Sequence, residues 1–220
     1  MASFAQWNMN RPSQLARYEE EVHPRFVRKY AHEELTFEDL YRLLRAQAPD
    51  DWAVAPGDVL VDVGCGTGWF ARRLAADERC RGAEVHGFDL SENALTVARN
   101  KQKASPALAS VDYQVGDVVA GLPVTGVHEA WFCGAWHQTG DERAALHSIA
   151  DALASDGLLH VQTYVVDEEA PEPVDRAVMR LLGHRVFDRA EIDEFARDCG
   201  LAIEAYEQRG MVALCTMRPA

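Results

Sequence analysis

The hydrophobic positions follow two spacings that predict different elements along the chain. Residues from about 12 to 48 are predicted to be helical, because apolar residues recur there at intervals of three and four. Pro49 ends this section. Beyond it, short apolar runs predict strands that alternate with helical segments. The expected strands are 59–63, 84–88, 111–115, 129–133 and 158–165, and the expected helices are 69–76, 91–103 and 141–154.

The last part of the chain is predicted to form a helix and a hairpin. Asp188 and Glu191 have the capping-box spacing, and Gly200 is placed to end the helix that they begin. Two strands follow, at about 202–208 and 211–217, and a link as short as Arg209-Gly210 makes them antiparallel. The strand–helix alternation predicts a parallel sheet with helices on both faces. The hairpin is expected to add an antiparallel edge.

Length and composition fit one α/β domain. We expect residues 1–50 to form a helical cap, and residues 51–220 to form the main domain with a substrate insert at about 165–186. The acidic start of that insert is expected to be a solvated surface loop. The formal net charge is −13, and no Lys/Arg cluster offsets it, so we expect neither a nucleic acid nor a membrane as partner.

The cysteines and the N-terminus indicate the compartment. None of the five cysteines has C-x-x-C spacing, which favours reduced thiols over a disulfide framework or a zinc site. Residues 1–11 contain no apolar leader segment, and no apolar run reaches membrane-spanning length. We therefore expect a cytoplasmic protein.

The most informative segment is Asp62-Val63-Gly64-Cys65-Gly66-Thr67-Gly68, between a buried strand and a helix. Glycine lets a ligand approach the main chain, and this end of a first strand is where open α/β sheets bind ligands. Dinucleotide sites use G-x-G-x-x-G, whereas here the spacing is G-x-G-x-G with an acid two residues before it. That carboxylate would repel a pyrophosphate but suits a ligand with an ammonium group. No Gly-Lys-Ser/Thr follows, which excludes a Walker loop.

This segment resembles the first motif of the class I S-adenosylmethionine-dependent methyltransferases, an acid followed by x-G-x-G-x-G. Further segments similar to the family's motifs follow in order: Phe88-Asp89-Leu90-Ser91, Gln114 to Val118, Leu153 to Leu159, and Phe187 to Leu201. The resemblance implies a Rossmann-like, doubly wound α/β fold. Its seven strands would have the order 3-2-1-4-5-7-6 with the last strand antiparallel. It also implies S-adenosylmethionine as the cofactor.

The resemblance assigns the cofactor contacts residue by residue. Asp89 would accept hydrogen bonds from both ribose hydroxyls, Asp117 would pair with the adenine amino group, and Val118 would donate its backbone N–H. The full expected cofactor-binding set is Asp62, Gly64, Cys65, Gly66, Gly68, Asp89, Leu90, Asp117, Val118 and Cys133.

The end of the fourth strand is expected to carry the chemistry. Methyl transfer from a sulfonium mainly needs alignment and exclusion of water, and a base only if the nucleophile arrives protonated. His137 is the candidate general base, and its alternative is a packing histidine. Trp136, Tyr18 and His184 are candidate substrate contacts, with core packing or a surface position as the alternative. No metal is expected, because Asp141 alone does not form a carboxylate cluster.

The sequence therefore predicts an S-adenosylmethionine-dependent methyltransferase that acts on a small molecule, as a monomer or homodimer. O-methylation is favoured over N- or C-methylation. Analogy with other enzymes of this fold favours a role in secondary metabolism. Two alternatives stay open. One is an enzyme of this fold that catalyses another reaction, such as a cyclisation, and the other is a non-catalytic module that binds the cofactor.

Overall fold

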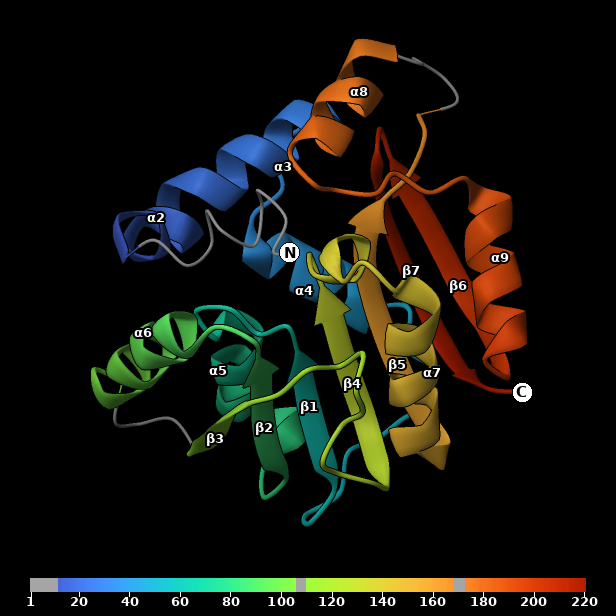
Figure 1. Ribbon diagram of the computed structural model, residues 1–220. Coiled ribbons are helices and arrows are strands. Elements are labelled where there is room, and N and C mark those ends of the chain that lie inside the picture. Colours follow the sequence, from blue (N-terminus) through green and yellow to red (C-terminus); the bar gives the residue numbers. More distant parts are fainter. Residues whose placement is uncertain (1–11, 106–109, 168–172) are drawn as a thin grey trace.

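A computed structural model of the chain describes residues 12–105, 110–167 and 173–220. Within these ranges the core is a seven-stranded sheet in the order β3-β2-β1-β4-β5-β7-β6 (Figure 1). The strands are β1 (Val59–Val63), β2 (Glu84–Asp89), β3 (Val111–Val115), β4 (Val127–Cys133), β5 (Leu153–Tyr164), β6 (Leu201–Arg209) and β7 (Val212–Pro219). β7 is antiparallel to both β5 and β6, and the other pairs are parallel. The predicted strand order and antiparallel edge are confirmed.

Helices cover both faces of the sheet, as predicted. The helices on one face are α4 (Phe37–Arg45), α5 (Trp69–Ala76) and α6 (Glu92–Lys103). Those on the other face are α7 (Glu142–Ala152) and α9 (Arg189–Asp198). The expected caps are present, since Ser91 accepts a hydrogen bond from the backbone of Ala94 and Asp188 forms a capping box with Glu191. None of the helices in the described part of the chain is both long enough and apolar enough to cross a membrane.

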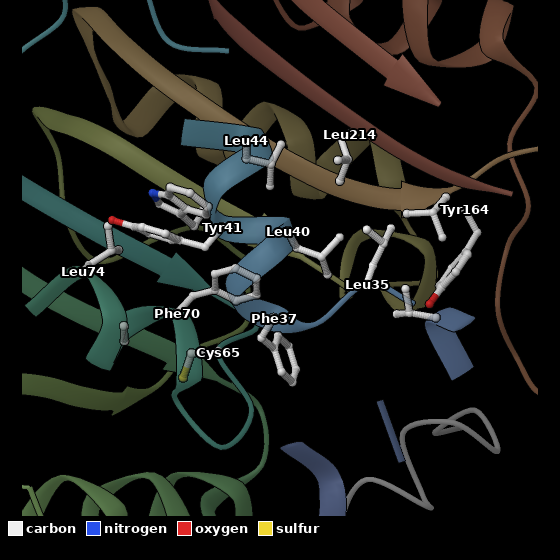
Figure 2. Close-up of a cluster of buried hydrophobic side chains, with 14 of the residues drawn as sticks. Leu35, Phe37, Leu40, Tyr41, Leu44, Cys65, Phe70, Leu74, Tyr164 and Leu214 are labelled. Atoms are coloured by element: carbon white, nitrogen blue, oxygen red, sulfur yellow. The ribbon is translucent and has the colours of Figure 1, made fainter. Parts of the chain in front are cut away.

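α4 attaches the N-terminal region to the sheet. Thr36 and Asp39 form a reciprocal capping box at its start, in which each side chain accepts a hydrogen bond from the other residue's backbone N–H. Leu40, Tyr41 and Leu44 project from it into the core and are fully buried (Figure 2). Each such side chain contributes roughly 1.5–3 kcal/mol through burial. The start of this helix is therefore fixed relative to the sheet.

The other N-terminal helices lie beyond the carboxyl ends of the parallel strands (Figure 1). α2 (Pro12–Arg17), the π-helical turn η1 (Tyr18–Val22) and α3 (His23–Ala31) follow one another directly. The helical section expected at 12–48 is thus interrupted before α4, because His32 adopts a left-handed φ of 59°. We use the term cap for residues 12–31.

The insert after β5 also contains a helix. α8 (Pro173–Leu181) lies beside α3, and Lys29 of α3 forms an ion pair with Asp175 at 2.9 Å (Figure 1). The sequence pattern did not predict α8. Most of the acidic start of the insert, expected to be a surface loop, falls in residues 168–172 and so lies outside the described residues.

The start of β5 differs from the prediction. The strand begins at Leu153, directly after α7, instead of at about residue 158. Val127 of β4 pairs with Leu153, and the pairing then resumes between Glu129 and Leu158. The residues between form an irregularity of the bulge type, which a hydrophobic pattern does not reveal.

A buried ion pair joins α4 to the centre of the sheet. Glu129 of β4, 0% exposed, accepts hydrogen bonds from Arg45 at 2.7 Å and from Trp131 Nε1 at 2.8 Å. His160 Nε2 lies 3.2 Å from the same carboxylate. Burial alone would raise the pKa of Glu129, but His160 and Arg45 lower it to about 2. The stability gained from this depressed pKa is present at neutral pH and is lost as the pH falls towards 2.

Replacing Arg45 by Met should lower the free energy of unfolding by about 3–5 kcal/mol, because it leaves the Glu129 carboxylate buried without its counter-charge. Urea unfolding near pH 7 measures the change. Arg42→Met is the matched control on the same helix, since Arg42 pairs with Glu38 at the surface and should shift the midpoint little. Equal shifts in the two variants would contradict the importance of the buried pair.

Candidate active site

The glycine segment forms a tight turn at the carboxyl end of β1. Gly64, Gly66 and Gly68 have φ values of +65°, +54° and +78°, in the left-handed region that favours glycine. A Cβ at Gly64 would overlap Ala135, and one at Gly68 would overlap the ring of Tyr113. At Gly66 it would meet no protein atom within 4 Å. The first and third glycines are therefore required by packing, whereas Gly66 borders open space.

Two carboxylates hold this turn in place. Asp62, 2% exposed, accepts a hydrogen bond at 2.9 Å from the backbone N–H of Ala71 in the first turn of α5. Asp89, at the end of β2, accepts hydrogen bonds from the backbone N–H groups of Gly66 and Ser91, both at 2.8 Å. Burial raises the pKa of Asp62 to about 8 and also raises the pKa of Asp89. The charged form of both carboxylates is therefore costly in the free protein. A positively charged ligand beside them would stabilise that charged form.

A pocket of about 270 Å³ lies beside the turn, at the carboxyl ends of β1, β2 and β4. The structure brings most of the expected contact residues together in its lining: Tyr18, Asp62, Gly64, Cys65, Gly66, Asp89, Leu90, Val118 and Cys133. Among the described residues, no Lys, Arg or His side chain lines it. The pocket therefore combines apolar surface with carboxylates.

Two of the expected cofactor residues lie outside this lining. Gly68 packs against Tyr113, so the structure gives it a role in folding the turn. Asp117 is exposed, and its carboxylate accepts a hydrogen bond at 3.0 Å from the backbone N–H of Val119. The pocket wall in this segment is formed by Gly116 and Val118.

The structure places Trp136 in the hydrophobic core instead of the pocket. Its side chain is fully buried, its ring stacks on Phe187 with centroids 4.6 Å apart, and its Nε1 donates to the carbonyl of Glu142. The expected substrate contact is corrected accordingly, because the chain turns into a short 3-10 helix after β4 and carries this ring to the α7–α9 side of the sheet.

His137 and His184 also lie outside the pocket lining. His137, 2% exposed, packs against Tyr164 and His184, with ring centroids 4.7 and 5.1 Å away, and its Nδ1 is 3.4 Å from Thr163 Oγ1. Burial and the neighbouring His184 hold the pKa of His137 well below its ordinary value. Burial also lowers the pKa of His184 to about 4. A general base must reach the proton that it removes, and this geometry does not support that role for His137.

The cap, α4 and α5 supply aromatic residues to the pocket, and of these the sequence singled out only Tyr18. Phe37, the first residue of α4, stacks between His23 at 3.7 Å and Trp69 at 5.2 Å, measured between ring centroids. Tyr18 packs against both Phe37 and His23. Tyr18, Phe37 and Trp69 line the pocket, and we call them the aromatic wall. The capping box could have placed Phe37 at a helix start, but only the fold shows what it faces.

Comparison with known proteins agrees with this geometry. A family model described as a methyltransferase domain matches residues 60–157, which include the glycine turn and Asp89. An O-methyltransferase of Pyrenophora dematioidea is 29% identical over 161 residues, which cover 71% of this chain and 54% of that protein. The chain spans about half or less of the length of the curated relatives that it matches.

Solved structures show the same fold. An O-methyltransferase from neocarzinostatin biosynthesis, in complex with S-adenosyl-L-homocysteine and 1,4-dihydroxy-2-naphthoic acid, has a TM-score of 0.68 and 22% identity, covering 95% of this chain and 59% of that one. The cyclase SpnF has a TM-score of 0.69 and 17% identity, covering 100% and 97% of the two chains. Residues 60–157 therefore match a methyltransferase domain, and the chain has the fold of the class I S-adenosylmethionine-dependent methyltransferases.

The pocket of this methyltransferase domain fits the family's cofactor in two respects. Gly66 leaves open space where any side chain would stand, so a ligand can approach the main chain there. Asp62 is buried and Asp89 is half-buried, and neither forms an ion pair with a described residue, so they suit the positively charged S-adenosylmethionine.

Gly66→Ala should weaken the binding of S-adenosylhomocysteine at least about tenfold, because its methyl group would enter the pocket. Gly68→Ala should destabilise the protein more than Gly66→Ala does, because both positions have a left-handed φ but only at Gly68 would the methyl group overlap Tyr113. Calorimetric titration and thermal unfolding of both variants separate the two effects. Normal binding by Gly66→Ala would show that this turn does not contact the cofactor.

Asp62→Asn should stabilise the ligand-free protein increasingly as the pH rises from about 5 to 8. The pKa of Asp62 is raised to about 8 on folding, so wild-type stability falls between the unfolded pKa and that value, by about 1.4 kcal/mol per pH unit. The amide oxygen can still accept the hydrogen bond from Ala71. Urea unfolding at both pH values tests this, with the surface variant Asp117→Asn as control. An unchanged difference between variant and wild type would overturn the assignment.

Proposed function

We propose that this domain transfers the methyl group of S-adenosylmethionine to an oxygen atom of a small, uncharged and largely apolar molecule. The observation that carries the proposal is the pocket, which joins a buried acidic turn to an aromatic wall and, within the described residues, has no cationic side chain in its lining. Oxygen as the acceptor atom is supported by the O-methyltransferases among the similar proteins.

In this proposal the acidic end of the pocket holds the cofactor. Asp62 would lie nearest the ammonium group, the main chain at Gly66 would follow the cofactor closely, and Asp89 would accept hydrogen bonds from the ribose hydroxyls. Leu90 and Val118 would enclose the adenine. When bound, S-adenosylmethionine supplies a methyl group that its sulfonium has already activated.

The other end of the pocket is proposed to hold the substrate. The aromatic wall offers flat apolar surface that would exclude water from the reacting atoms and restrict the substrate to one plane. Gln138 and Thr139 also line the pocket and place polar groups beside Cys133, at the end of β4. Alignment of the acceptor oxygen with the methyl carbon is then the main contribution of the protein.

We further propose that the transfer does not use His137 as a base. Asp62 and Asp89 are assigned to the cofactor, and burial raises the pKa of the thiols of Cys65 and Cys133 well above their ordinary value. The site therefore suits a neutral hydroxyl that is acidic enough to release its proton to water during the transfer, as an activated phenol or an enol does.

A second candidate function is a cyclisation without methyl transfer. It is favoured by one observation, the likeness over the whole chain to a structure named as a cyclase. An apolar pocket without a base would also suit a reaction that needs only shape and the electrostatic effect of the sulfonium. The O-methyltransferase relatives favour methyl transfer over this alternative.

The experiment that separates these functions measures S-adenosylhomocysteine. Purified protein with S-adenosylmethionine should release it when given uncharged phenols or enols, and much less with matched carboxylates or alkylamines. Conversion of a compound without S-adenosylhomocysteine would favour cyclisation. Cofactor binding without any turnover would favour a non-catalytic module.

His137→Gln should retain a kcat within about threefold of wild type on any substrate found in that panel, since loss of a general base costs about 100-fold or more. The pH profile should also keep its shape. Thermal unfolding and S-adenosylhomocysteine titration verify that the variant is folded. A loss of 100-fold with normal cofactor binding would establish His137 as the base after all.

A further inference from the structure

Glu19, in the turn η1 of the cap, makes an unusual set of contacts with the cofactor half of the domain. Its carboxylate accepts hydrogen bonds from Thr67 Oγ1 at 2.6 Å and from Arg72 at 2.9 and 3.0 Å, and it pairs with Lys101 at 2.8 Å. Thr67 belongs to the glycine turn, Arg72 to α5 and Lys101 to α6. One side chain of the cap is therefore bonded to three separate elements around the pocket.

These contacts are well shielded from solvent. The side chains of Glu19 and Arg72 are each 11% exposed. Burial alone would raise the pKa of the Glu19 carboxyl, but Arg72, Lys101 and Thr67 together hold it below its ordinary value. Hydrogen bonds between charged groups in such surroundings are stronger than exposed ion pairs. The Glu19 cluster, which we define as Glu19, Thr67, Arg72 and Lys101, therefore favours the observed position of the cap.

The cluster also acts on the glycine turn itself. Arg72 donates to the backbone carbonyl of Thr67 at 2.5 Å while it holds Glu19. Thr67 stands between Gly66 and Gly68 and is 2% exposed. A glycine-rich turn loses much conformational freedom on ordering, so contacts that fix Thr67 restrict the main chain at Gly66.

The residue before Glu19 reaches the pocket. Tyr18 lines it and packs against Phe37, another member of the aromatic wall. Because Tyr18 and Glu19 share one helical turn, the bonds that hold Glu19 also set the position of the Tyr18 ring. Loss of the Glu19 contacts would let Tyr18 move away from the other residues of the aromatic wall.

We propose that Glu19 is a positioning residue that keeps the cap closed over the cofactor pocket, and that S-adenosyl ligands enter and leave when the Glu19 cluster opens. This inference rests on the proposed cofactor site. Closing fixes Tyr18 against the ligand and Thr67 beside it, whereas opening exposes four polar side chains to water and separates η1 from α5 and α6.

Glu19→Gln removes the negative charge of the side chain but keeps an oxygen that accepts the hydrogen bond from Thr67. This change should alter the rates at which S-adenosylhomocysteine binds and dissociates. If opening of the cluster limits both entry and exit, weakening the closed state raises the association and dissociation rate constants together. We expect each to rise about tenfold for S-adenosylhomocysteine, with the Kd changed by less than about threefold. Stopped-flow measurement of intrinsic fluorescence, with Trp69 in the pocket wall, follows both steps.

Glu21→Gln is the matched control, because Glu21 lies in the same turn and its ion pairs with Arg17 and Arg25 involve exposed side chains. Its rate constants should equal those of the wild type. Arg72→Met should resemble Glu19→Gln, and the double variant should be no faster than the faster single variant, because both changes open the same cluster.

Two results would overturn this inference while the cofactor site stands. Wild-type rate constants in Glu19→Gln would show that the cluster does not control access. A rise in the dissociation rate alone would show a static contact instead of an opening step. Failure of wild-type protein to bind S-adenosylhomocysteine would instead remove the proposed function, and with it the basis of this inference.

Discussion

The turn between β1 and α5 is held by two carboxylates, Asp62 buried and Asp89 half-buried, and neither forms an ion pair with a described residue. The backbone N–H of Ala71 at the start of α5 would ordinarily donate to the side chain of the N-cap residue. That residue is Gly68, which has no side chain, and Asp62 accepts the hydrogen bond in its place. Asp89 holds the main chain at Gly66 from the neighbouring strand. The turn is ordered by acids whose charge is costly in the free protein, and a cationic ligand offsets that cost.

The third buried acid of the sheet shows the opposite arrangement. Glu129 has Arg45 and His160 beside it, and its pKa is lowered to about 2, whereas the pKa of Asp62 is raised to about 8. The difference arises from neighbouring positive charge, because both side chains are almost fully buried. Glu129 therefore holds α4 against the sheet. Asp62 and Asp89 have no ion-pair partner among the described residues and can pair with a positively charged ligand.

The cap and α4 together link these two parts of the molecule. α4 is fixed to the sheet by its apolar side chains (Figure 2) and by the buried ion pair. Its first residue, Phe37, lines the pocket. The turn η1, which precedes α3, places Tyr18 in the pocket lining. It also places Glu19 where it accepts a hydrogen bond from Thr67 of the glycine turn. Residues that are far apart in the chain thus line one pocket. The polar contacts of Glu19 join the cap to the elements around that pocket.

The sequence by itself determined the alternation of strands and helices, the caps of α6 and α9, and the acidic glycine turn, because hydrophobic period, capping and turn chemistry depend on neighbouring residues. The order of the strands in the sheet followed only from the resemblance to the methyltransferase family. It did not reveal α8, the early start of β5 or the partners of Glu129 and Glu19. It also favoured Trp136 and His137 in the pocket, although both are side chains of the core. Only the tertiary structure decided which side of the sheet each side chain after β4 occupies. That choice depends on the turn of the main chain beyond the strand and on the helices packed against it, and neither follows from local sequence.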